Sequence, residues 1–358
     1  DGCQRIELRV LISITGAVFL LVLTWILVPE HGLVGLAWAQ IGQGILILLG
    51  SWVLLQRELP SLTLLSPKWR YTLFREMFQY GFNFQVVSVA VMLFDPITKV
   101  LMATFGGLSS TAYYEMASRM VMKFHALLVS ANQVLVPQVA NLNETAPDEI
   151  RKIYRNSYRI VFFLSLPLFA GVAAIAPLAS ELWIGHYEQS FVEYSLLLTA
   201  GYWLNTLIGP AYFVNLGTGS LRLNTLSHLA IGILNGVFGY LLGLVFGDVG
   251  VVSGHVLALV TGSCLLILGF HRDQHMPLAG LFPAEDKFLF FSCCLGLLMG
   301  WWTFRSLEDS LVPIVNAGLT LAACTIPTGI AFWLHPMRRK IVSRIVAEIG
   351  RRASIASL

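Results

Sequence analysis

Ten apolar segments, each about as long as a bilayer is thick, constrain this chain more than any other feature of its sequence. A helix that crosses the hydrocarbon core needs about 20 mostly apolar residues, because the core is about 30 Å thick and a helix rises about 1.5 Å per residue. Backbone polar groups in lipid must be hydrogen-bonded within their own segment, so these spans are predicted to be helices. The sequence therefore predicts an all-α, polytopic membrane helix bundle with about ten transmembrane helices. The predicted spans are Val10–Val28, Gly32–Leu55, Gly81–Phe105, Tyr113–Val136, Ile160–Leu182, Phe191–Asn215, Thr225–Val245, Gly250–Phe270, Phe288–Phe304 and Leu311–His335.

Composition excludes several classes of protein. Apolar residues make up 56% of the chain and charged residues only 12%, which is about half the usual share for a soluble domain. A soluble enzyme, a nucleic-acid-binding domain and a disordered protein are therefore excluded. The five cysteines lack the paired spacing of a metal site, and no nucleotide-binding or metalloprotease motif is present. We expect no cofactor, no metal and no enzymatic activity.

The distribution of lysine and arginine predicts the orientation of the spans. With the N-terminus placed inside, nineteen of the 23 lysines and arginines fall in inside segments and only Arg305 falls outside. The other three, Lys99, Arg119 and Lys123, lie within spans. Because cytoplasmic loops of membrane proteins are enriched in these residues, both termini are predicted to be cytoplasmic.

Ionisable residues are concentrated in two adjacent spans. Asp95 and Lys99 lie four residues apart in the first span, and Glu115, Arg119 and Lys123 follow the same spacing in the second. Residues at this spacing share one face of a helix. Charged groups inside a bilayer are costly and usually face a cavity or a partner. The five groups sum to +1, so we expect them to line a water-filled cavity suited to an anionic ligand. Structural ion pairs between the two helices are the alternative.

Helix geometry refines this prediction. At about 100° per residue, Gln133 falls within about 40° of the direction of Arg119, so the polar stripe continues along the second span. Asp95 and Lys123 each lie about 15 Å below the outer end of their span. We therefore expect Asp95 to face Lys123, with Lys99 and Arg119 in the layer above. The candidate binding residues are Asp95, Lys99, Glu115, Arg119, Lys123 and Gln133.

The stretch Phe94–Ala140 resembles the seventh and eighth spans of the polysaccharide exporters. These include the O-antigen and oligosaccharide-lipid flippases of the multidrug/oligosaccharidyl-lipid/polysaccharide exporter superfamily. The shared features are an aspartate in the first helix, a Phe-Gly turn, a tyrosine, an Ala-x-Arg motif and a closing proline. In this sequence they are Asp95, Phe105-Gly106, Tyr114, Ala117-Ser118-Arg119 and Pro137.

The resemblance implies a domain organisation. Such exporters have twelve to fourteen spans in two six-helix lobes, so this chain is expected to lack the first four helices. Residues 1–80 would form part of the first lobe, 81–270 the second six-helix lobe and 271–335 a terminal helix pair. Residues 336–358 combine apolar and basic side chains and are predicted to form a basic amphipathic tail at the cytoplasmic surface.

The resemblance also implies a function: translocation of an undecaprenyl-pyrophosphate-linked oligosaccharide across the bacterial cytoplasmic membrane for surface polysaccharide synthesis. The expected partners are the lipid-linked oligosaccharide, membrane lipids, H⁺ or Na⁺ as coupling ion and other polysaccharide-assembly proteins, with no nucleic acid. One alternative is a cation-coupled multidrug antiporter of the same superfamily, which would favour an acidic or aromatic cavity. Another is a membrane-embedded glycosyltransferase or ligase, which would need a larger outer loop than any predicted here.

Overall fold

The computed structural model describes residues 6–58, 71–307 and 312–338, and within these ranges the secondary structure is entirely helical. The part of the predicted basic tail beyond Arg338 lies outside the described residues. Short 3₁₀ helices occur at Pro147–Glu149 (η1), Leu278–Leu281 (η2) and Ala284–Asp286 (η3). The α-helices are α1 (Ile6–Glu58), α2 (Tyr71–Phe105), α3 (Gly107–Asn132), α4 (Leu135–Thr145), α5 (Ile150–Trp183), α6 (Gln189–Thr206), α7 (Gly209–Thr218), α8 (Arg222–Asp273), α9 (Lys287–Ser306) and α10 (Pro313–Leu334).

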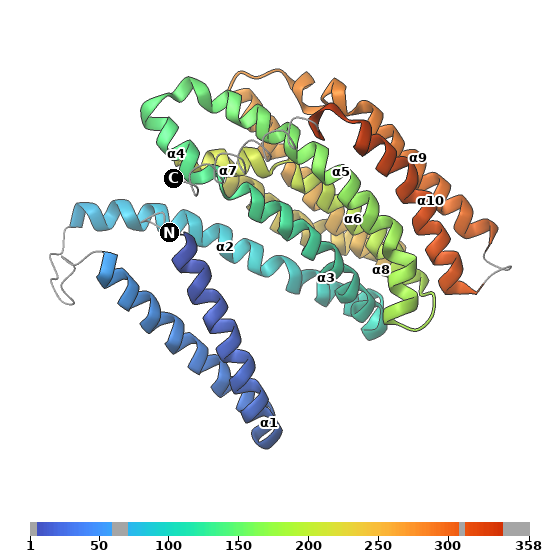
Figure 1. The fold of residues 1–358 in the computed structure, drawn as a ribbon, viewed down its shortest axis with the longest axis horizontal. Helices are drawn as coiled ribbons and strands as arrows, with labels where there is room; N and C mark the ends of the chain where they lie inside the picture. The colour runs from blue at the N-terminus through green and yellow to red at the C-terminus, as the bar shows by residue number, and fades with distance from the viewer. Residues whose placement is uncertain (1–5, 59–70, 308–311, 339–358) are drawn as a thin grey trace, which may run out of the picture. The chain divides into compact units, whose positions relative to one another are not determined.

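Two of the helices are hairpins that reverse at a single glycine. Gly32 in α1 has φ 55° and ψ −133°, and Gly247 in α8 has φ 63° and ψ −139°. Glycine adopts positive φ readily because it has no Cβ, so each reversal needs no longer loop. Figure 1 shows the two arms of α1 side by side. The arms of α1 and of α8 correspond to four of the predicted spans.

The helices confirm the predicted polytopic bundle. Among the described residues, six stretches are long and apolar enough to cross a membrane, and they include the α1 and α8 hairpins. The others contain α3, α5, α9 and α10. The predicted spans Gly81–Phe105 and Phe191–Asn215 correspond to α2 and to α6 with α7, which are not among those six. This is a multi-pass membrane protein.

Two predicted boundaries are corrected by the positions of glycine and proline. α3 begins at Gly107 rather than Tyr113, so the predicted outer loop before it shrinks to a tight turn. The predicted span Phe191–Asn215 is divided between Thr206 and Gly209. Proline has no backbone N–H, so Pro210 could not donate the hydrogen bond that a continuous helix would require at this position. In the first turn of α7, where Pro210 lies, no such hydrogen bond is needed.

The chain forms two compact units, Asp1–Arg75 and Glu76–Leu358. Within the second unit, α3 and α8 pack against α6, while α5 packs against α6, α9 and α10. Two buried clusters hold these helices together. One is centred on aromatic residues of α5, and the other fills the space between α3, α5, α6 and the second arm of α8.

Very close backbone contact joins the two arms of α8. A Cβ on Gly254 would lie 2.5 Å from the backbone nitrogen of Gly239, closer than real Cβ contacts come. A Cβ on Gly239 would also lie 2.8 Å from a methyl carbon of Leu101 in α2. Small residues are typical of such contacts between membrane helices, because they let backbones approach. The two arms of α8 thus lie close together, and α2 packs against them at Gly239.

Candidate functional site

A tight turn between α2 and α3 sets the register of the two helices that carry the predicted site. Gly107 has φ 78°, and a Cβ on Gly106 would lie 2.5 Å from Cβ of Asp248. Asp248 Oδ2 accepts hydrogen bonds from Ser110 Oγ at 2.6 Å and from Tyr194 OH at 2.7 Å. The turn is thus held against the Gly247 reversal of α8 and against α6. These contacts fix the register of α2 relative to α3, and so determine which residues of the two helices lie opposite each other.

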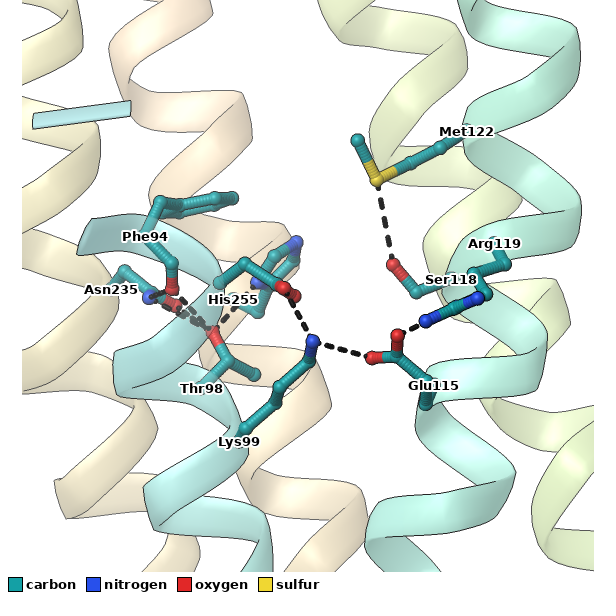
Figure 2. A network of polar contacts seen from close by, with 10 residues as sticks. Phe94, Thr98, Lys99, Glu115, Ser118, Arg119, Met122, Asn235 and His255 are labelled. Carbon is teal, nitrogen blue, oxygen red and sulfur yellow. Dashed lines mark hydrogen bonds and ion pairs between the residues drawn. The ribbon is translucent and has the colours of Figure 1, made fainter. Parts of the chain in front are cut away.

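Four charged side chains form a continuous ladder across the two helices. Lys99 Nζ lies 2.6 Å from Asp95 Oδ2 on its own helix and 2.7 Å from Glu115 Oε2 on α3. Arg119 Nε donates to Glu115 Oε1 at 2.7 Å. Figure 2 shows Glu115 between Lys99 and Arg119, with its two oxygens directed to different cations. We call Asp95, Lys99, Glu115 and Arg119 the charged ladder.

The last member of the ladder is the most exposed. The side chain of Arg119 is 77% exposed, compared with 27% for Glu115 and 35% for Lys99. Arg119 uses Nε for Glu115, and its two terminal nitrogens have no hydrogen-bond partner among the residues that the structure describes. Two aligned N–H donors of a guanidinium fit two oxygens of a phosphate or carboxylate. The ladder therefore ends in an exposed guanidinium group whose chemistry is suited to an anion.

The predicted pairing of Asp95 with Lys123 is wrong. Asp95 pairs with Lys99, one turn along its own helix, because that contact costs no reorientation of the two helices. The side chain of Lys123 is exposed and forms no ion pair with any described residue. Gln133, also exposed, caps the end of α3 through its backbone N–H. The structure thus brings together four of the six predicted residues and leaves Lys123 and Gln133 separate.

A buried polar cluster on another face of α2 fixes the ladder in place. Thr98 Oγ1 lies 3.1 Å from His255 Nδ1, and Asn235 Nδ2 donates to Thr98 Oγ1 at 2.9 Å and to the Phe94 carbonyl at 3.0 Å. Thr98, Asn235 and His255 are all at most 1% exposed. Figure 2 shows this cluster beside Lys99. Because Thr98 and Lys99 are adjacent in sequence, the bonds to both arms of α8 also orient the lysine.

Sequence alone offers little indication of this cluster. Asn235 is one of several asparagines in predicted spans, and none of them stands out by its spacing. His255 follows Gly254, and the close approach of the two α8 arms at that glycine places its ring 4.3 Å from the ring of Phe94. In the sequence, the only local indication of this cluster is a small residue, Gly254, next to a histidine within a predicted span. The partner 157 positions away cannot be read from it.

An uncharged cavity of about 480 Å³ lies between α2, α3, the α6–α7 junction and the first arm of α8. Its polar lining includes His125, Asn132, Asn205 and His228, together with several aromatic and aliphatic side chains. None of the ladder residues lines it, and the expected cavity lined by ionisable groups stays a prediction. Among the described residues, no three His, Cys, Asp or Glu side chains gather in a way that could hold a metal ion.

Comparison with solved structures gives a related fold. The chain is similar to the lipid II flippase MurJ in its inward-closed conformation, with a TM-score of 0.57 and 12% sequence identity. The similarity covers 91% of this chain and 66% of the MurJ chain. This chain therefore spans slightly less than two thirds of the length of that flippase. At this level of identity the similarity establishes the fold.

Sequence comparison supplies the family. A search of curated proteins gives no match. The family model described as polysaccharide biosynthesis protein matches residues 4–192, which is more than half of the chain and includes α1 to α5 with the whole charged ladder. The chain therefore belongs to the polysaccharide biosynthesis protein family.

Proposed function

We propose that this chain belongs to a flippase that moves an undecaprenyl-pyrophosphate-linked oligosaccharide across the bacterial cytoplasmic membrane. The observation that carries the proposal is the charged ladder, which ends in an exposed arginine with two terminal nitrogens available to a ligand. Membership of the polysaccharide biosynthesis family and the MurJ-like fold support it. The substrate would present two phosphates, which are the groups that a guanidinium binds best.

The ladder suggests how the headgroup is held. Asp95, Lys99, Glu115 and Arg119 sum to zero charge, and exposed Lys123 one turn beyond Arg119 adds a positive charge. Glu115 orients Arg119 through Nε, so the side chain is positioned before the ligand arrives. Arg119 and Lys123 would then bind the pyrophosphate, while the polyprenyl tail stays in the bilayer. No covalent bond is made or broken, and the protein is proposed to act as a transporter rather than an enzyme.

The proposal includes the arrangement of the protein in the membrane. Residues 1–80 are assigned to a first lobe, 81–270 to a second lobe and 271–335 to a terminal pair, with both termini in the cytoplasm. Lobes that rock about a site alternately open it to either side, which is how related transporters move their substrates. A coupling ion, H⁺ or Na⁺, and other polysaccharide-assembly proteins complete the proposed system.

The multidrug antiporter alternative finds less support in this geometry. Binding of a cationic drug would favour surplus acidic or aromatic groups at the site. Here both carboxylates of the ladder, including that of Asp95 with its side chain 46% exposed, are already paired with cations, while exposed Lys123 has no ion-pair partner among the described residues. The surplus charge therefore favours an anionic substrate.

Substitution of Arg119 tests the proposal. In cells whose surface polysaccharide depends on this protein, Arg119→Ala is expected to abolish export of the lipid-linked sugar at normal membrane protein level. Because the side chain is 77% exposed, its truncation leaves no buried cavity and should spare the fold. Arg119→Lys should restore only part of the export, since it returns the charge without the paired donors. Arg222→Ala, which removes an exposed arginine at the start of α8, serves as the matched control.

A double substitution separates ligand binding from a purely structural role. If Arg119 only compensated Glu115, the Glu115→Ala/Arg119→Ala protein would regain export, because neither charge would remain unpaired. The proposal predicts that the double variant stays inactive. Normal surface polysaccharide in Arg119→Ala cells, measured at equal protein level, would contradict the proposed role.

A further inference from the structure

A second concentration of positive charge lies far along the chain from the ladder. A cavity of about 280 Å³ lies between the first turns of α5 and the connection from α8 to α9. Arg155 and Arg159 line it one turn apart, together with Tyr154, Tyr158 and His271. We call this cavity the basic pocket. Its volume equals that of about nine molecules of liquid water, which is enough for a phosphate group.

The walls of the basic pocket are rigidly connected. Tyr154 OH lies 2.8 Å from His271 Nε2 at the end of α8, and Tyr158 OH donates to the Leu281 carbonyl at 2.9 Å. Both tyrosines are at most 3% exposed. The two bonds hold α5 against the α8–α9 connection, so the pocket is a feature of the fold rather than a gap between independent side chains.

A buried contact between a histidine and an aspartate lies next to the segment that lines the pocket. His335 Nε2 lies 3.1 Å from Asp286 Oδ1 and 2.9 Å from the Glu285 carbonyl oxygen, and both side chains of the pair are at most 2% exposed. The ring of Phe163 stacks on His335 with centroids 4.6 Å apart. This contact joins the end of α10 to the segment that lines the pocket. Asp286 Oδ1 has no hydrogen-bond partner among the described residues, and the Asp286 carboxylate interacts electrostatically with Arg159 of the pocket.

The charged residues that line the pocket are of one sign. Neither aspartate nor glutamate is among the residues that line it, whereas two arginines are. Arg155 is exposed and Arg159 is half-buried, and neither has a carboxylate within ion-pair distance among the described residues. The nearest carboxylates in sequence to the α8–α9 connection are those of exposed Asp273, exposed Glu285 and buried Asp286, and only Asp286 has a recorded electrostatic interaction with a pocket arginine, Arg159. Two guanidinium groups one turn apart beside a concave surface are well arranged for a phosphate.

The position of the pocket selects the source of that phosphate. Arg155 and Arg159 lie on the helical segment that leads into the apolar part of α5, where a helix leaves water and enters the bilayer. Basic pockets between helices at this level are typical binding places for anionic lipid headgroups. We propose that the basic pocket binds the phosphate group of an anionic membrane phospholipid. This site is distinct from the ladder and does not depend on the proposed substrate.

Binding of defined lipids to the purified full chain tests the proposal. The apparent Kd for phosphatidylglycerol is measured by native mass spectrometry in detergent, with phosphatidylcholine as the zwitterionic comparison. Arg155→Gln/Arg159→Gln is expected to raise the Kd for phosphatidylglycerol about tenfold or more, because two charge-assisted contacts are lost. The matched control is Arg151→Gln/Lys152→Gln, which removes the same charge from the first turn of α5 but from residues outside the pocket.

Each result decides the proposal. Equal loss of affinity in both double variants would show that the lipid responds only to general positive charge and would overturn the site. Unchanged affinity in Arg155→Gln/Arg159→Gln would overturn it as well. Inorganic phosphate is added as a competitor, and displacement of the lipid at equal concentration would assign the pocket to free phosphate instead. Circular dichroism and gel filtration check folding, and the single variant Arg155→Gln, at an exposed position, replaces the double variant if it misfolds.

Discussion

Lys99 and Glu115 connect α2 to α3 through a contact of 2.7 Å between Nζ and Oε2, and each of them also holds a second partner on its own helix. Lys99 contacts Asp95 and Glu115 contacts Arg119, so the two residues form the centre of a chain of four charges. Exchange of the two central charges would place a carboxylate beside Asp95 and an ammonium group beside Arg119. The position of each charge in the chain is therefore fixed by two neighbours.

A double-mutant cycle measures the strength of this connection. We expect Lys99→Met and Glu115→Gln to show a coupling energy of about 1 kcal/mol, the upper range for partly exposed pairs. The charge exchange Lys99→Glu/Glu115→Lys should fail to restore stability, because it creates two like-charge neighbours. Unfolding in mixed detergent, followed by circular dichroism, gives the free energies. Full recovery in the exchanged protein would mean that the outer members of the ladder contribute nothing.

The buried cluster beside the ladder should be more sensitive than the ladder itself. Asn235→Leu removes the amide that donates to Thr98 Oγ1 and to the Phe94 carbonyl oxygen. Both acceptors then lose that hydrogen bond in the buried interior. We expect a loss of about 2 kcal/mol in the free energy of unfolding. The same change at exposed Asn143 in α4 should cost less than about 0.5 kcal/mol. Equal effects at the two positions would show that the cluster is not cohesive.

Two glycines of α8 offer a matched test of the close packing between its arms. Gly254→Ala places a methyl group 2.5 Å from backbone atoms of the opposite arm, which cannot move aside independently. It should therefore destabilise the protein by about 2 kcal/mol or more. At Gly236 a methyl group would meet only a side-chain carbon of Ile97 at 3.9 Å, so Gly236→Ala should be neutral or stabilise by up to about 1 kcal/mol. Thermal unfolding of the two variants in the same detergent compares them directly.

Cysteine labelling tests the orientation proposed from the charge distribution. In a background without native cysteines, we expect cysteines at exposed positions 109 and 186 to react with an impermeant reagent added outside intact cells. A cysteine at exposed position 143 should react only after the membrane is opened. Reversed accessibility at any of the three positions contradicts the orientation.

The sequence predicted the helices well because the bilayer imposes their length and their hydrogen bonding. It also placed Asp95, Lys99, Glu115 and Arg119 in one polar group, since spacing of four residues defines a helix face. The partners were harder to predict. Depth counted from the ends of predicted spans paired Asp95 with Lys123, but α3 begins at Gly107, and Asp95 has a cation within reach one turn away on its own helix.

The cluster of Thr98, Asn235 and His255 could not be predicted in this way. It depends on how closely the two arms of α8 approach, which is set by Gly239 and Gly254 in three dimensions. Thr98 is separated in sequence from Asn235 by 137 positions and from His255 by 157 positions. Hydrogen bonds over such separations produce no periodic pattern in the sequence. Local spacing therefore identified the charged face of α2 but not the contacts on its other face that orient it.

The spacing of four in the charged ladder also has a consequence for biogenesis. Asp95 and Lys99 neutralise each other within α2, and Glu115 and Arg119 do so within α3, so neither pair needs the other helix. Each pair can leave the translocon for lipid with its charges already compensated, which lowers the cost of inserting ionised groups. Lys99 and Glu115 then meet laterally once both helices are in the bilayer. The same four residues thus first compensate charge during membrane insertion and then connect the two helices in the assembled site.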